Sequence, residues 1–140
     1  MTEELKIKLF NEAKNMLNFS YTPYSNFKVG AALLSESGKI FTGCNIENAA
    51  YGPSNCAERT AFFKAVSEGI LKFKAIMVIG GSGGIIKDYC PPCGVCRQVM
   101  MEFCNPETFS IFLAKSETDI IEYKLKDLLP LGFGNSDLQK

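Results

Sequence analysis

The sequence contains no histidine among its 140 residues, so neither a metal site nor an acid–base site in this chain can use an imidazole. It also has no excess of charge of either sign, because Lys plus Arg and Asp plus Glu number 15 each. A neutral balance provides no electrostatic attraction to a polynucleotide or to an anionic membrane. We therefore expect neither nucleic acid nor a membrane as a partner.

Long apolar runs are absent as well, and no segment approaches the length of a membrane helix. The chain begins Met1-Thr2-Glu3-Glu4, which lacks the basic start and the apolar stretch of a signal peptide. These two absences predict a cytoplasmic protein. Cytosolic thiols stay reduced, so the six cysteines are not expected to form disulfides, and their spacing points to a metal or to catalysis.

Helical patterns alternate with buried-strand patterns along the chain. Apolar residues with charge between them predict an amphipathic helix over residues 3–17. Other helices are expected at 56–68, capped by Asn55, at 93–103 and at 126–129. Strands are expected at 29–34, 39–44, 75–79, 109–113 and 120–123, and a flexible glycine loop at 80–84. This alternation and the length predict one α/β domain spanning residues 1–140.

Two short segments concentrate side chains that can bind a metal. One is Cys56-Ala57-Glu58-Arg59, and the other is Pro92-Cys93-Gly94-Val95-Cys96. Each lies at a predicted helix N-terminus, where unpaired N–H groups and the helix dipole favour thiolates. Cys93 and Cys96 are three residues apart, so one helical turn directs both thiols toward one point. A second helix can then bring Cys56 beside them.

Three thiolates leave one tetrahedral position of a zinc ion open, which is typical of a catalytic rather than a structural site. Zinc in such a site lowers the pKa of a water molecule toward neutrality. Glu58 follows Cys56 by two residues and can reach that water. We expect Glu58 to move protons in catalysis rather than to bind the metal.

These residues resemble the signature of the zinc deaminases, in which a His or Cys ligand precedes a Glu by two residues and a Pro-Cys-x-x-Cys follows later. The match consists of Cys56, Glu58, Pro92, Cys93 and Cys96. Longer stretches are similar to the short cytidine deaminases, namely residues 21–34, 43–51, 56–61, 93–99 and 128–133. The resemblance covers nearly the whole chain. One departure is Pro91, where the family is expected to have a small residue such as Ser.

The resemblance implies a three-layer α/β/α sandwich with a mixed central sheet. It also implies one zinc ion per chain and a homotetramer with shared active sites. The reaction would be hydrolytic deamination of cytidine and deoxycytidine to uridine, deoxyuridine and ammonia in pyrimidine salvage.

The resemblance also implies roles for substrate-binding residues. Asn45 and Glu47 would bind the ribose hydroxyls, and Phe27 would pack against the pyrimidine. The backbone N–H of Ala57 would donate a hydrogen bond to the base. Tyr51 would close the site near a subunit boundary, and Phe133 would reach into the site of a neighbouring subunit.

Other interpretations of the cysteines exist. The pair Cys93-x-x-Cys96 alone is also typical of thioredoxin-like redox proteins, but Cys56-x-Glu58 favours zinc. A structural, non-enzymatic zinc module would need a fourth ligand, which Cys90 could offer. Three successive turns of one segment cannot easily surround a metal together with Cys56, so Cys90 is interpreted as a neighbouring thiol. Cys44 and Cys104 are interpreted as core residues.

Two other deaminase classes share the zinc signature. The blasticidin-type enzymes are one, but Arg59 and the Asn45-x-Glu47 pattern favour a nucleoside substrate. The nucleic-acid deaminases are the other, and the neutral charge disfavours them.

Arg59 is expected to tune the metal. Three thiolates outnumber the two positive charges of zinc by one, and a negative set of ligands weakens zinc as a Lewis acid. Arg59 lies one helical turn beyond Cys56, so its guanidinium is expected to donate to the sulfurs of Cys56 and Cys93. The alternative is a solvated arginine with no such role.

Overall fold

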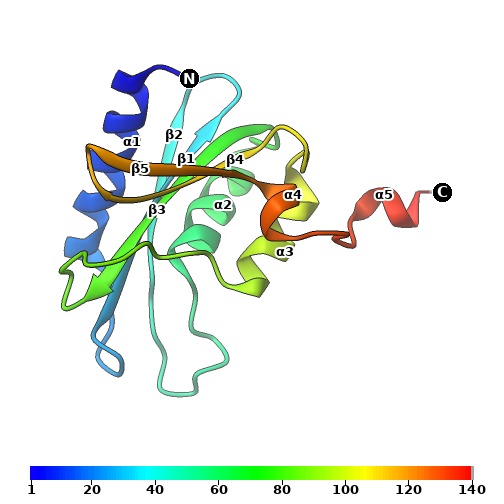
Figure 1. Ribbon diagram of the computed structural model, residues 1–140. Coiled ribbons are helices and arrows are strands. Elements are labelled where there is room, and N and C mark those ends of the chain that lie inside the picture. The colour runs from blue at the N-terminus through cyan, green and yellow to red at the C-terminus, as the bar shows by residue number, and fades with distance from the viewer. Residues whose placement is uncertain (140) are drawn as a thin grey trace.

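A five-stranded sheet forms the centre of the molecule in the computed structural model, which describes residues 1–139 (Figure 1). Its strands are β1 (Phe27–Ser35), β2 (Ile40–Cys44), β3 (Phe73–Ser82), β4 (Ser110–Ser116) and β5 (Asp119–Lys124). They lie side by side in the order β2-β1-β3-β4-β5. Strands β3 and β4 run parallel, and every other neighbouring pair is antiparallel, so the sheet is mixed as expected.

Helices cover both faces of this sheet (Figure 1). The helices are α1 (Glu3–Met16), α2 (Ala57–Ser67), α3 (Gly94–Phe103), α4 (Leu125–Leu128) and α5 (Asn135–Leu138), with a 3-10 turn, η1 (Leu17–Phe19), and α5 extends away from the sheet (Figure 1). Helix α1 packs on one face through a core that includes Leu9 and Met77. Helices α2 and α3 pack on the other face, where Phe62 and Met100 are fully buried. These layers confirm the three-layer α/β/α architecture.

Two glycines allow the helices to approach the sheet closely. A Cβ on Gly30 would lie 2.0 Å from the carbonyl oxygen of Ala13 in α1. A Cβ on Gly43 would lie 2.2 Å from the carbonyl oxygen of Ala57, at the start of α2. Helices α1 and α2 therefore pack closely on the sheet at glycines of β1 and β2, where a side chain would collide with the helix backbone.

The segment around Gly81 differs from the sequence prediction of a flexible loop at 80–84. Residues 80–82 belong to β3 and pair with β1. Position 81 is occupied by glycine because the strand is crowded there. A Cβ on Gly81 would lie 1.9 Å from the carbonyl oxygen of Ile85. Only Gly83 and Gly84 turn the chain, both with positive φ. The short helix α5 was not expected from the sequence.

None of the helices within residues 1–139 is long and apolar enough to cross a membrane.

Candidate metal centre and active site

The first turns of α2 and α3 carry the cysteines singled out in the sequence. Cys56 is the N-cap of α2 and Cys93 is the N-cap of α3, and neither helix has a side-chain cap hydrogen bond. The expectation that Asn55 caps α2 was wrong. Asn55 pairs through its backbone with Ile46, and its amide donates to Thr60 Oγ1 instead.

The three sulfurs of Cys56, Cys93 and Cys96 converge on one point, and all lie within 4.8 Å of one another. The Cys56–Cys93 and Cys93–Cys96 distances are 3.6 and 3.5 Å, and all three thiols are free. Tetrahedral ligands at the usual Zn–S distance lie about 3.8 Å apart. Three soft thiolates at this spacing fit zinc, and within residues 1–139 no other such cluster occurs.

Glu58 lies in the first turn of α2 and is 3% exposed. Burial raises the pKa of its carboxyl to about 7. The negative charge of Cys56 contributes to the same increase. A carboxyl group poised near neutrality, next to a metal site, can both accept and donate a proton.

Arg59 points toward the sulfurs. Its Nη2 donates to Cys56 Sγ at 3.3 Å, which confirms one of the two expected contacts. The expected contact with Cys93 is not formed, and the charges of Cys56 and Cys96 help to raise the pKa of the guanidinium. Hydrogen bonds from Cys96 and then Arg59 hold the pKa of Cys56 below that of a free thiol.

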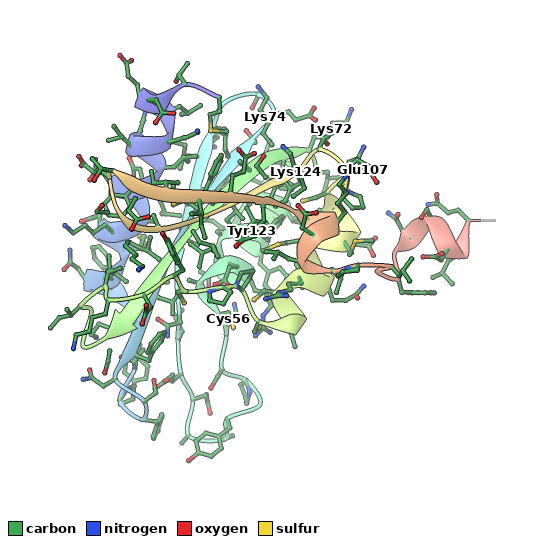
Figure 2. All side chains as sticks on the ribbon, in the orientation of Figure 1. Cys56, Lys72, Lys74, Glu107, Tyr123 and Lys124 are labelled. Carbon is green, nitrogen blue, oxygen red and sulfur yellow. The ribbon has the colours of Figure 1, made fainter. Side chains whose placement is uncertain are left out.

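A cavity of about 320 Å³ opens beside this cluster. Among the site residues expected from the sequence, those that line this cavity are Asn45, Glu47, Cys56, Glu58, Arg59 and Cys93. Sequence reasoning missed Val29, Ser54 and Asn55 as lining residues and gave Cys90 and Pro91 no such role. Figure 2 shows Cys56 at the end of the molecule from which the long loop before α2 extends.

Asn45 and Glu47 use part of their hydrogen-bonding capacity to shape this cavity. The Asn45 amide accepts from the Val29 N–H and donates to the Phe27 carbonyl. The Glu47 carboxylate accepts from the backbone N–H groups of Tyr24 and Ser25 and from the Ser25 hydroxyl. The Ser25 hydroxyl bond is the main reason that the pKa of Glu47 is lowered. Both side chains keep free positions that can bind a ligand.

Three of the expected substrate-binding side chains do not line the cavity of their own chain. Phe27 is 42% exposed, Tyr51 is 73% exposed and Phe133 is 58% exposed. Tyr51 lies in the loop before α2 with a positive φ, in edge-to-face contact with Tyr24. Ala57 is not among the residues that line the cavity either, and it is fully buried at the start of α2.

The remaining cysteines lie outside the three-sulfur cluster, as the sequence interpretation expected. Cys44 and Cys104 are buried. Cys90 lines the cavity wall, and burial raises the pKa of its thiol to about 12.

Comparison with known proteins agrees with this geometry. The sequence profile of the cytidine and deoxycytidylate deaminase zinc-binding region matches residues 3–112. The cytidine deaminase of Sporosarcina psychrophila is 50% identical over 131 residues, which cover 94% of this chain and 93% of the relative. The cytidine deaminase of Halalkalibacterium halodurans is 47% identical over 130 residues, covering 93% and 95%.

Solved structures share the fold as well as the sequence. A crystal structure of cytidine deaminase from Burkholderia pseudomallei superposes with a TM-score of 0.82 at 45% identity, covering 95% of this chain and all of that chain. The cytidine deaminase from Mycobacterium tuberculosis gives a TM-score of 0.76 at 35% identity, covering 91% and 95%. Together with the cysteine cluster and the buried glutamate, these likenesses establish that the chain belongs to the cytidine and deoxycytidylate deaminase family.

Proposed function

We propose that residues 1–140 form one catalytic domain that deaminates cytidine and deoxycytidine in cytoplasmic pyrimidine salvage. Cys56, Cys93 and Cys96 would hold one zinc ion per chain. The observation that supports this best is the buried Glu58 carboxyl beside three converging thiols, at a cavity of about 320 Å³. Three thiols that can bind a metal, an acid–base group and space for a small substrate thus occur together.

A zinc ion held by Cys56, Cys93 and Cys96 would supply the chemistry of a water with lowered pKa. Glu58 would accept a proton from the attacking water and deliver it to N3 of the pyrimidine, which would make C4 electrophilic. After the water oxygen has added to C4, Glu58 would pass the second proton to the exocyclic amine, which would leave as ammonia. One carboxyl can act as base and as acid because it alternates between its two states within a turnover.

The remaining residues orient the nucleoside. We assign the ribose hydroxyls to Asn45 and Glu47, whose side chains line the cavity and keep unused hydrogen-bonding positions. The Ala57 N–H would donate to the base, and Phe27 would pack against it. Arg59 would draw charge from the sulfurs through its bond to Cys56.

The substrate is expected to be a free nucleoside. The Glu47 carboxylate, kept ionised by its hydrogen bonds, favours hydroxyls and repels a phosphate on the sugar. Zinc-loaded protein should therefore deaminate cytidine and deoxycytidine, with cytidine monophosphate and cytosine much poorer. Ultraviolet absorbance follows each reaction. A kcat/KM for cytidine monophosphate equal to that for cytidine would refute the nucleoside assignment, and inactivity toward all four compounds would refute the function.

The zinc ligands can be tested by replacing each cysteine with Ala and measuring bound metal. Cys56→Ala, Cys93→Ala and Cys96→Ala should each lose zinc. Cys90→Ala is the matched control, because Cys90 lines the same cavity but lies outside the sulfur cluster. Loss of zinc from Cys90→Ala equal to that from Cys96→Ala would show that the ligand set is wrong.

We also propose a homotetramer with shared active sites. Tyr51 and Phe133 are largely exposed and lie off the cavity of their own chain, so a second copy is needed to give them the expected roles. Sedimentation equilibrium should give four chains per particle, and Phe133→Ala should raise KM. A fully active monomer would contradict the shared site.

A further inference from the structure

The C-terminal segment, residues 128–135, is attached to the helix that carries Cys96. Arg97 Nη1 donates to the Leu128 carbonyl at 2.7 Å, and Gln98 Nε2 donates to the Phe133 carbonyl at 2.7 Å. Farther along, the Asn135 amide donates to the Glu102 carbonyl at 3.3 Å. The C-terminal segment thus runs along successive turns of α3.

The backbone of this segment is sharply bent as well as attached. Leu131 has a φ of 54°, in the left-handed region that a bulky residue rarely adopts. Pro130 precedes it and Gly132 follows it, and Gly132 lies close to the Leu129 side chain. An unfavourable conformation of this kind persists only where the surroundings fix it. Here the bonds from Arg97 and Gln98 lie on either side of the bend.

The side chains held in this way are apolar and face outward. Leu131 is fully exposed and Phe133 is 58% exposed, and neither lines the cavity of its own chain. Figure 1 shows the segment leaving the body of the molecule beside α3 and α4. Holding an apolar side chain in solvent buries no apolar surface within the chain. Contact with a second copy would supply the burial that makes this arrangement favourable.

Gln98 is the more informative of the two anchoring residues. Arg97 also donates through Nε to the Pro92 carbonyl, directly before Cys93, so a change there would disturb the metal centre. The Gln98 amide acts on the Phe133 carbonyl alone among its hydrogen bonds within residues 1–139. A change at Gln98 therefore affects the position of Phe133 with little direct effect on the sulfurs.

We propose that Gln98 is a positioning residue that acts between subunits, because it fixes Phe133 for delivery into the active site of a neighbouring copy. Substrate binding in one subunit then depends on a hydrogen bond on the α3 helix of another. This inference rests on the shared active site of the proposed function and identifies the residue that sets up the sharing.

The first experiment separates KM from kcat. Gln98→Ala and the size-matched Gln98→Glu, which lacks the donor, should each raise KM for cytidine about three- to ten-fold, the usual loss for one neutral hydrogen bond. The kcat per bound zinc and the zinc content should stay within about two-fold. In a Phe133→Ala background, Gln98→Ala should add nothing further to KM. Glu102→Ala is the matched control, because its exposed carboxylate on the same helix takes no part in holding the segment.

The second experiment tests action between subunits. Gln98→Ala chains are refolded together with an excess of Glu58→Gln chains, so that the active sites belong to Gln98→Ala subunits and receive Phe133 from neighbours with an intact Gln98. KM should return to the wild-type value. A KM that stays raised would show that Gln98 acts within its own subunit and would overturn the proposal.

The two levels of hypothesis fail in different ways. If Phe133→Ala leaves KM unchanged, the shared site itself is wrong. If Phe133→Ala raises KM while both Gln98 variants bind cytidine as the wild type does, the shared site stands and only the role of Gln98 is wrong.

Discussion

Glu58 and Arg59 are neighbours in the sequence, but the fold places their side chains in different surroundings. Glu58 is buried, and its pKa is raised by loss of solvent. Arg59 turns toward the sulfurs and donates to Cys56. Substitution of each residue is therefore expected to have a distinct kinetic signature.

Glu58→Gln should fold and keep its zinc, because Glu58 is not one of the three residues whose sulfurs converge. Its activity should fall by about 10²–10⁴-fold or more, the usual contribution of an acid–base group, since it serves several proton transfers. Metal content and kcat are measured on the same sample. Near-normal turnover in the zinc-loaded variant would remove Glu58 from the mechanism.

Arg59→Gln should lower kcat per bound zinc by about ten-fold or more, as is typical when a partner of a metal ligand is lost. The reason is that the sulfurs then keep their full negative charge. Exchanging Cys56 for His in that background removes one negative charge from the ligands and should recover part of the activity. Unchanged turnover per zinc in Arg59→Gln would favour the solvated-arginine alternative.

At the residue scale, the sequence predicted what depends on local spacing. The convergence of the Cys93 and Cys96 sulfurs could be predicted because residues three apart lie on one face of a helix. The nearness of Glu58 to Cys56 follows from their separation of two residues. Val29 and Ser54 could not, because their place on the cavity wall depends on how distant segments pack. For Tyr51 and Phe133 the resemblance alone suggested a role, and a single chain leaves both exposed.

At the scale of elements, the sequence predicted every strand and the three long helices, with boundaries displaced by a few residues. The largest error, at Gly80 and Gly81, came from interpreting glycines as flexible when they relieve crowding inside a paired strand. The Asn55 error came from a competing interaction, since the chain before α2 pairs with Ile46. Both errors concern contacts between segments that lie apart in the chain.

Gly43→Ala tests how the sheet positions the metal centre. A Cβ there would press on the backbone of Ala57 and Ala61, so the start of α2, with Cys56, must move away from the sheet. We expect unfolding free energy to fall by about 1–3 kcal/mol, as for other overpacked sites, and zinc affinity to fall as well.

Gly30→Ala is the matched control, because its Cβ would press equally hard on α1 at the opposite face of the sheet. It should destabilise the fold without a comparable loss of zinc affinity. Chemical denaturation and a competition titration with a zinc chelator give the two quantities. Equal loss of zinc affinity in both variants would show that Gly43 has no special role in placing Cys56.

At the scale of the whole molecule, the mixed sheet decides which parts of the site are local and which are not. Strands β1 and β2 form a hairpin, whereas the parallel pair β3 and β4 is joined by a crossover that contains α3. Two of the proposed zinc ligands, Cys93 and Cys96, lie within that crossover. The third, Cys56, precedes β3 in the chain.

This topology has a consequence for the time order of folding. Hairpin contacts form quickly. A parallel pair of strands forms slowly, because the entropy of closing a long loop is lost before the contacts between the strands contribute favourable free energy. We therefore expect the three sulfurs to come together after the rate-limiting step of folding, so that zinc slows unfolding without speeding refolding. Stopped-flow traces with and without zinc should share one refolding rate and differ in the unfolding limb. A refolding rate that rises with zinc concentration would mean that the metal helps to nucleate the fold.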